Sequence, residues 1–344
     1  DVTVQAVIQV RQNLWKGTNM LNGLRASLAA TLPLGLACAI SSSELAAQCG
    51  TIVLGGTVVS QTWTPAGSPY CITQDTQVAN LTIQPGVQVL IDGLFEINVL
   101  SMFAVGTQAD PIVFAPKVPS TPWKGLKYVN APLGSQLIYC RVEGSRERGI
   151  EIVNSEPVIQ HCVIRNNYIE QGNGGGIHAT LAAGQVLVVQ NCTITGNSAN
   201  PNLLGSYAGG GVYVAGDSVF DNCRFSDNLV RSRCSTSFCN ASARGGGIYI
   251  ANGTSMFANC TFSNNTANAS VSSFNPPAGL AEGQGGGVYL ASGQLSMTNC
   301  IVTCNTVLAS NGGSPAPRGA GVYVAGGTLT ANNTTIARNN KEGV

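Results

Sequence analysis

Acidic residues gather at two places in the chain, and grouped carboxylates are what acid–base chemistry on polysaccharides requires. One group is Glu143, Glu147 and Glu151, set among arginines, and the other is Asp217, Asp221 and Asp227. Glycoside hydrolysis uses two carboxyl groups about 5 to 10 Å apart, and lyases commonly add calcium held by several carboxylates. These six residues are therefore the candidates for acid–base catalysis.

The surroundings of these acids favour a second interpretation, in which none of them is catalytic. In the repeat described below, Asp221 aligns with Gln190 and Ala258, so it stands alone in its column. Isolated acids of this kind are usually solvated turn residues. The run from Arg141 to Glu151 mixes arginine with glutamate, which is typical of an exposed ion-pair face. The sequence thus leaves open whether the chain is an enzyme and favours a role without catalysis.

Four tyrosines could bind a ligand through their rings. Tyr213, Tyr249, Tyr289 and Tyr323 each stand two residues after the last glycine of a recurring glycine-rich motif. Rings at this spacing suit stacking against sugar faces, but the same column would also stabilise a sheet by contact between rings. We favour the structural interpretation and keep the tyrosines as binding candidates.

Two motifs recur through the second half of the chain and define a repeat. The last glycine of the first motif falls at Gly149, Gly176, Gly211, Gly247, Gly287 and Gly321. The second motif places cysteine at Cys140, Cys162, Cys192, Cys223, Cys260 and Cys300, and asparagine at Asn167, Asn197, Asn228, Asn265, Asn305 and Asn339. Length varies mainly between the asparagine and the next glycine, so insertion is tolerated at one corner, as stacked coils require.

Apolar and polar residues alternate within each repeat, as they do in half-buried strands. Short strands with glycine between them favour an all-β fold, a parallel β-helix or single-stranded β-solenoid, over a helical repeat. The asparagine column suits stacked amides and left-handed turns. The inserts 198–208, 229–244, 266–284 and 306–318 are predicted to form a rim of loops on one edge. Because recognition usually resides in loops on a rigid scaffold, this rim is the predicted binding surface.

The motifs also carry a resemblance. Gly-Gly-x-(Ile/Val) combined with Phe-x-x-Asn, present as Phe225 to Asn228 and Phe262 to Asn265, resembles the passenger repeats of polymorphic outer membrane proteins. These and related bacterial surface proteins belong to the pectin-lyase-like superfamily of right-handed β-helices. The resemblance covers roughly 136–340, although Ile194, Val302 and Ile336 replace phenylalanine. It implies an exported, surface-displayed, right-handed solenoid, adhesin-like or structural, and it specifies no ligand. Because the superfamily includes polysaccharide lyases and glycoside hydrolases, the resemblance leaves such an enzyme as the alternative.

Composition limits the partners. Only 10% of residues are charged and the net charge is +1, so the sequence lacks the excess of basic residues that nucleic-acid binding requires. A glycan or a surface protein is the expected partner, and the protein is expected to be secreted or on a bacterial-type cell surface. We predict no transmembrane span in the mature region and no cofactor.

The first 47 residues are predicted to precede the folded domain. Met20 begins an apolar stretch that ends in Ala37-Cys38-Ala39, an A-x-A-like cleavage site, so 20–39 is the expected signal peptide. A buried helix that caps the solenoid is the alternative. Residues 48–130 are expected to form an N-terminal cap and the first coils, and 131–344 the repeated coils, with a truncated or uncapped end. An uncapped end exposes strand edges, so a self-assembling filament or surface-layer component is a further alternative.

The twelve cysteines divide by position. Those of the repeated column should be buried thiols, because parallel side chains in one column point the same way. Cys234 with Cys239, and Cys49 with Cys71, are disulfide candidates if the protein is exported. No histidine or cysteine cluster has the spacing of zinc ligands, so the sequence predicts no metal site.

Overall fold

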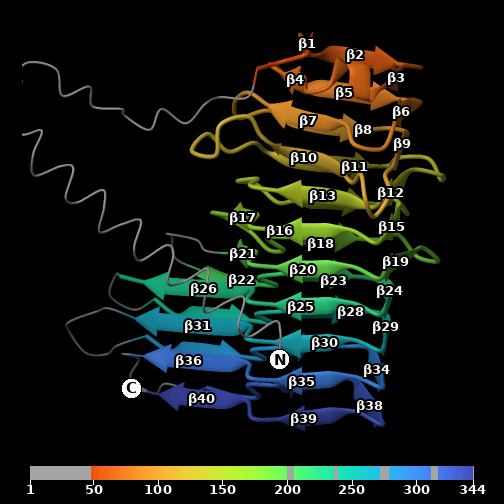
Figure 1. Ribbon diagram of the computed structural model, residues 1–344. Helices are drawn as coiled ribbons and strands as arrows, with labels where there is room; N and C mark the ends of the chain where they lie inside the picture. The colour runs from red at the N-terminus through yellow and green to blue at the C-terminus, as the bar shows by residue number, and fades with distance from the viewer. Residues whose placement is uncertain (1–47, 200–204, 236–238, 272–278, 311–316, 344) are drawn as a thin grey trace, which may run out of the picture. The chain divides into compact units, whose positions relative to one another are not determined.

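The glycine and asparagine columns fix where the strands lie in this protein, because the strands of each coil must pair in register with those of the neighbouring coils. The computed structural model describes residues 48–343 except 200–204, 236–238, 272–278 and 311–316. In this part the chain winds into stacked coils, and three sheets run along the stack (Figure 1). The predicted all-β parallel solenoid is confirmed. The expected signal peptide at 20–39 lies outside the described residues.

Each coil supplies short strands to three parallel sheets. Sheet 1 contains β1 (Thr51–Val53), β4 (Tyr70–Ile72), β7 (Gln88–Ile91), β10 (Ile112–Pro116), β13 (Cys140–Glu143), β16 (Val163–Arg165), β20 (Thr193–Thr195), β25 (Arg224–Ser226), β30 (Thr261–Ser263), β35 (Ile301–Thr303) and β39 (Thr335–Ala337). Sheet 2 contains β2 (Gly56–Val59), β5 (Thr76–Ala79), β8 (Glu96–Val99), β11 (Gly125–Val129), β14 (Ile150–Val153), β18 (Ile177–Thr180), β23 (Val212–Ala215), β28 (Ile248–Asn252), β33 (Val288–Leu290) and β37 (Val322–Val324). Sheet 3 contains β3 (Thr62–Trp63), β6 (Leu81–Ile83), β9 (Met102–Val105), β12 (Gln136–Ile138), β15 (Val158–Gln160), β19 (Val186–Gln190), β24 (Asp217–Asp221), β29 (Thr254–Ala258), β34 (Gln294–Thr298) and β38 (Thr328–Asn332). A 3₁₀ turn, η1 (Pro65–Gly67), lies in the first coil.

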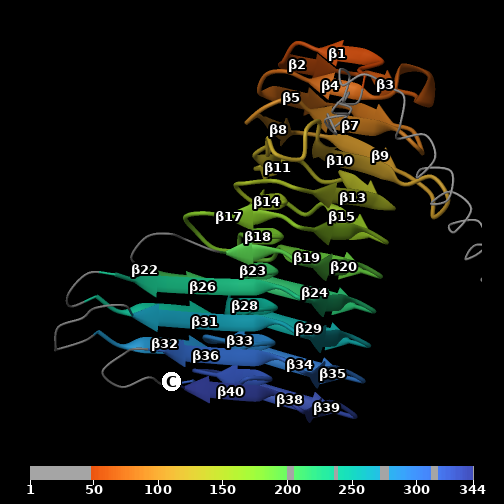
Figure 2. The same ribbon diagram turned by 60° about the vertical axis from the view of Figure 1, so that its left-hand side comes forward.

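The described parts of the inserts are mainly strands, which corrects the expectation that the inserts form a rim of loops. These strands form two further parallel sheets that project from the stack as a wing (Figure 2). The long wing sheet contains β17 (Tyr168–Ile169), β21 (Ser198–Ala199), β26 (Leu229–Cys234), β31 (Thr266–Val271), β36 (Thr306–Ser310) and β40 (Asn340–Gly343), and the short one contains β22 (Gly205–Ala208), β27 (Ala241–Arg244) and β32 (Ala281–Gln284). The inserts themselves alternate, as in Thr-Ala-Asn-Ala-Ser-Val of β31, and this period-two pattern makes strands.

The glycine motif is explained by close approach of the backbone. The first glycine of the motif has a positive φ, 68° at Gly209 and 66° at Gly245, where a side chain would be strained. A Cβ on the third glycine would meet the next coil: at Gly211 it would lie 2.5 Å from the carbonyl oxygen of Gly247 and 2.9 Å from Cγ of Asn228. The coils can therefore turn from the wing into sheet 2 only where side chains are absent.

The asparagine column forms a buried ladder of amides. Asn228 donates from Nδ2 to Oδ1 of Asn265 at 2.9 Å, and its own Oδ1 accepts from both Nδ2 and the backbone N–H of Asn197 at 3.1 Å. The left-handed residue is the one before each ladder asparagine, such as Asp227 with φ 59°, and not the asparagine itself. The amide of each ladder asparagine therefore forms hydrogen bonds between coils, and the preceding residue adopts the left-handed conformation of the turn.

The interior is one continuous apolar core that includes the cysteine column. The column cysteines of the repeat are buried and free, as predicted. Each thiol donates to backbone carbonyls, as Cys260 does to Phe220 at 3.4 Å and to Ala258 at 3.2 Å. Thr334, which replaces cysteine in the last coil, makes the equivalent hydrogen bonds through its hydroxyl. The column therefore combines apolar packing with a hydrogen bond at each coil.

Candidate functional site

Glu143 anchors an ion-pair cluster on the outer face of sheet 1. Arg141 donates from Nε to one carboxylate oxygen at 3.1 Å, and Arg165 of the next coil donates from Nε to the other at 2.5 Å. The Glu143 side chain is 18% exposed, whereas the two arginines are 37% and 42% exposed. One half-buried carboxylate thus fixes two guanidinium groups at the surface.

Glu151 lies on a different sheet, on β14 of sheet 2. Arg148 donates from Nη1 to Glu151 at 2.9 Å, and Nζ of Lys127 lies 3.8 Å from its other oxygen. Lys127 also donates to Glu96 at 2.9 Å. Burial alone would raise the pKa of Glu96, but hydrogen bonds from Lys127 and Asn98 outweigh it and lower that pKa below its ordinary value. The Lys127–Glu96 pair is therefore a structural ion pair.

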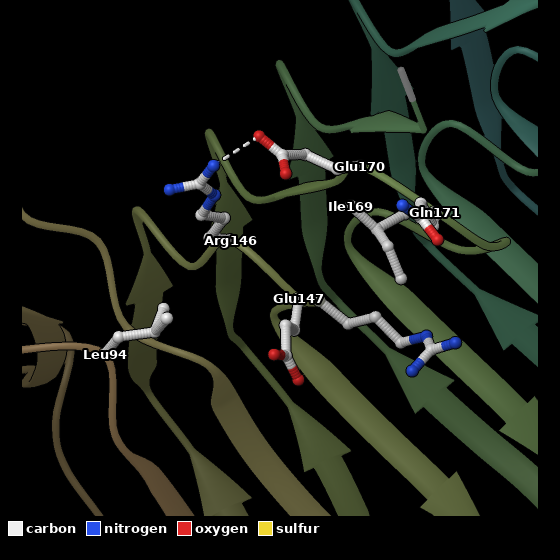
Figure 3. A pocket seen from close by; sticks show the side chains of 7 residues that line it. Leu94, Arg146, Glu147, Ile169, Glu170 and Gln171 are labelled. Carbon is white, nitrogen blue, oxygen red and sulfur yellow. Dashed lines mark hydrogen bonds and ion pairs between the residues drawn. The ribbon is translucent and has the colours of Figure 1, made fainter. Parts of the chain in front are cut away.

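Glu147 lines a pocket of about 460 Å³ at the place where the wing begins (Figure 3). The lining residues are Leu94, Arg146, Glu147, Arg148, Ile169, Glu170 and Gln171. Arg146 donates from Nη2 to Glu170 at 2.6 Å, and both side chains are 43% exposed. In Figure 3 the carboxylate of Glu147 is turned away from this pair. Glu147 and Glu170 therefore line one opening in contact with solvent, although their carboxylates point apart.

Sequence reasoning missed Glu170. It follows Asn167 by three residues, in the segment whose counterparts in later coils are inserts. No repeated column therefore marks it, and its place in the same pocket as Glu147 depends on the packing of two successive coils. Its only signal in the sequence is that it is an acid one coil away from an arginine-rich run.

The aspartates of the other acidic group do not converge. Asp217 and Asp221 stand at the two ends of β24, about 13 Å apart at the usual rise of a strand. Asp217 accepts from the backbone N–H of Thr254 at 2.7 Å, and Asp221 accepts from Nδ2 of Asn259 at 3.0 Å. Asp227 stands at the corner after β25. These acids therefore make contacts at separate places on one coil.

The tyrosine column is a continuous stack of rings on the outer face of sheet 2. Ring centroids are 5.3 Å apart for Tyr213 and Tyr249 and 4.9 Å for Tyr249 and Tyr289, with ring planes within 11° of parallel. His178 continues the stack above Tyr213, and Tyr323 ends it with a tilt of 37°. Because the inner ring faces contact other rings, they are not open to a sugar. The stack therefore ties coils together.

His178 is the titratable member of this stack. Burial, followed by the nearby charge of Arg148, lowers the pKa of His178 to about 4. Its Nδ1 is buried and has no hydrogen-bond partner among the residues that the structure describes. The imidazole is therefore neutral at pH 7 and packs as an aromatic ring.

Disulfides join the two cysteine pairs that the sequence singled out. Cys49 is bonded to Cys71 in the first coils, and Cys234 is bonded to Cys239 near the tip of the wing. In the described part of the chain, no group of three or more His, Cys, Asp or Glu side chains could hold a metal ion. Nor does any helix there have the length and apolar character needed to cross a membrane.

Stacked parallel sheets, self-matching columns and a side wing define a parallel β-solenoid. The family model of the right-handed β-helix region matches residues 129–344, well over half of the chain. The chain therefore belongs to the right-handed β-helix family. No curated protein and no solved structure was found to match it. Family membership here defines the fold, and the site must decide the function.

Proposed function

We propose that this chain is an adhesin-like binding module displayed outside a bacterial-type cell, in which the tip edge of the wing contacts a glycan or a protein partner. The observation that carries this proposal is the wing itself. The inserts are built into a second layer of stacked strands, and β26, β31 and β36 end side by side along one edge of it, the tip edge.

The wing has the construction of a rigid platform. β26 and β31 pair in register over six residues, and β31 pairs with β36 over five. Between the long and short wing sheets lies a small core of mostly alanine and valine: Ile169, Ala199, Val230, Cys234, Ala241, Ala243, Ala267, Ala269, Val271, Ala281, Val307, Ala309 and Ala320. Stacking sets successive wing strands about 4.8 Å apart. A rigid scaffold that carries variable tips is the usual arrangement for recognition.

Export is supported by the disulfides and by the surface. Disulfides persist in oxidising compartments, and one of the two here lies near the tip of the wing. The low content of charge agrees with a surface of Ser, Thr and Asn, and the resemblance to bacterial surface passengers leads to the same expectation. These features support the proposal that the protein is secreted or displayed on the cell surface.

The test is retention of the full chain on a panel of glycans and surface proteins. One variant replaces residues 272–278, between β31 and β32, by glycine and serine. A matched control makes the same replacement at 182–184, in the exposed turn between β18 and β19. We expect the tip variant to lose retention at least tenfold with an unchanged thermal midpoint, while the control binds normally. Equal retention by both variants would refute the proposal.

A second candidate function rests on the pocket of Figure 3. Glu147 and Glu170 both line it, and glycoside hydrolysis uses a pair of carboxyl groups at one site. The same polysaccharides should then be scored for newly formed chain ends. New ends that disappear in Glu147→Gln, at an unchanged thermal midpoint, would establish a hydrolase or lyase. Retention without new ends would leave the binding module alone.

A further inference from the structure

The inserts carry an excess of positive charge. They contain one acid, Glu282, and four arginines: Arg231, Arg233, Arg244 and Arg318. The whole chain has a net charge of only +1, so the rest of it is slightly negative. In the described part of the chain, Arg244 is the only one of these arginines in an ion pair, 3.6 Å from Glu282. Most of the positive charge of the wing is therefore not neutralised by the wing itself.

Two of these arginines share the outer face of the long wing sheet, on β26 (Figure 2). The alternate residues Val230, Ser232 and Cys234 are buried inside the wing. Arg231, half-buried, and Arg233, exposed, therefore face outward. Among the described residues neither guanidinium has an ion pair, and the Nε of Arg231 is buried without a hydrogen-bond partner. Two adjacent positive charges thus lie on one face without an acid.

The stacking of the wing strands does not require these charges. The paired residues of the next two coils are all neutral: Asn268, Ser270, Leu308 and Ser310. Burial, followed by the nearby charge of Arg233, lowers the pKa of Arg231 below its ordinary value, so the two guanidinium groups repel each other. An anion bound over both groups would relieve this repulsion.

The spacing of the two arginines matches that of an extended peptide. At the usual rise of a strand, residues i and i+2 lie on the same face about 6.6 Å apart, in β26 as in any extended chain. Carboxylates at alternate positions of a peptide can thus each meet one guanidinium as a fork, the strongest geometry for this pair. Asn268 and Ser270 stand beside the arginines in the next coil, half-buried on the same face. Their amide and hydroxyl groups can bind the polar groups of the same peptide.

We propose that the outer face of the wing around Arg231 and Arg233 binds an extended protein segment with acidic residues at alternate positions. The two guanidinium groups bind successive carboxylates, and Asn268 and Ser270 bind polar groups beside them. The proposal goes beyond the function proposed for the tip edge, because it uses the face of the long wing sheet and needs none of the tips.

The experiment is an NMR titration of two blocked octapeptides of equal composition with the full chain. One peptide has four repeats of Glu-Thr, and the other has two repeats of Glu-Glu-Thr-Thr, in which no two glutamates are two positions apart. Arg231→Gln and Arg233→Gln each remove one guanidinium and relieve the repulsion, so the fold should be unchanged or more stable. The matched control is Arg224→Gln, because Arg224 is exposed on β25 of the same coil but belongs to sheet 1.

We expect the alternating peptide to bind about fivefold more tightly than the other, because only it reaches both guanidinium groups, and this is the contribution expected of one partly exposed ion pair. Each glutamine variant on the wing should lose this preference without a lower thermal midpoint. Salt at about 1 M should also remove it, by screening the charges. Arg224→Gln and the wing-tip variant should bind both peptides normally, so failure of this surface and failure of the tip edge are distinguishable.

Three results with the peptides would each overturn the proposal: equal affinity for the two peptides, an undiminished preference in Arg231→Gln or Arg233→Gln, or an equal loss in Arg224→Gln. Tighter binding to phosphatidylserine vesicles than to either peptide, with the same dependence on the two arginines, would also overturn it. The partner of this face would then be a membrane surface and not a protein segment.

Discussion

The coils before residue 171 and the coils after it are held together in different ways. Seven of the eight ion pairs in the described residues lie between Asp92 and Glu170, and one, Arg244 with Glu282, lies in the later coils. The later coils instead stack asparagine on asparagine and tyrosine on tyrosine. In-register stacking sets like residues about 4.8 Å apart, where like charges repel and neutral groups can bond. Nearly identical repeats therefore need neutral columns, while divergent coils can alternate opposite charges.

The largest effect is expected in the buried amide ladder. Asn228→Ala leaves the backbone N–H of Asn197 without its acceptor and removes the donor to Ile194, both in a buried site. We expect a loss of about 3–5 kcal/mol in the free energy of unfolding, measured by urea titration. Asn259→Ala, in the exposed outer column, should lose about 1 kcal/mol or less. Equal losses would show that burial does not distinguish the two asparagine columns.

The boundary between charged and neutral coils should be sensitive to acid. The pKa of His178 is lowered to about 4 in the folded chain. Between about pH 6.5 and 4, His178 is therefore protonated in the unfolded chain and neutral in the folded chain. Stability should therefore fall as pH drops from about 6.5 to 4, by up to about 3 kcal/mol. His178→Tyr continues the tyrosine stack and should remove this loss, as measured by urea titrations across that range.

Glu96 provides the internal control for that measurement. Its pKa is lowered in the fold, so its contribution is present above the ordinary glutamate pKa of about 4.3 and is lost as pH falls further. Any loss of stability in acid that remains in His178→Tyr should therefore occur only below about pH 4.3. If the variant still loses stability between pH 6.5 and 5, another group is responsible.

The charged coils should respond to salt where the neutral ones do not. Glu143→Gln removes the charge shared by Arg141 and Arg165, and we expect a loss of about 1 kcal/mol, since such pairs are partly exposed. At about 1 M salt this loss should shrink, because charges are then screened within about 3 Å. The loss in Asn228→Ala should not change. A salt-independent loss in Glu143→Gln would contradict the proposed distinction.

The smallest effect is expected in the cysteine column. Cys260→Ser keeps a donor for the carbonyls of Phe220 and Ala258, as the hydroxyl of Thr334 does in the last coil. We expect a change below about 1 kcal/mol, with Cys260→Ala losing about 1 kcal/mol more. Thermal unfolding under reducing conditions measures both. A larger loss in the serine variant would show that the apolar packing of sulfur outweighs its hydrogen bonds.

How far the sequence predicts the site differs from residue to residue. The tyrosine column was predictable, since Tyr213 and Tyr249 follow glycines that mark equal positions in successive coils. The stacking of their rings on one another was not predictable, because ring orientation depends on side-chain packing. The wing was misjudged as loops because its inserts differ in length, and length variation hid the alternation within them.

The sequence by itself determined the coil, its columns and its point of insertion. This is because each column residue contacts its own counterpart in the next coil, so the requirement repeats and is visible as a repeat. Only the tertiary structure decided the openings. Leu94 and Glu170 line one pocket, and Gln108 and Asn191 line another, although Leu94, Gln108 and Glu170 belong to no repeated column. Such contacts occur once in the molecule, so no periodicity in the sequence records them.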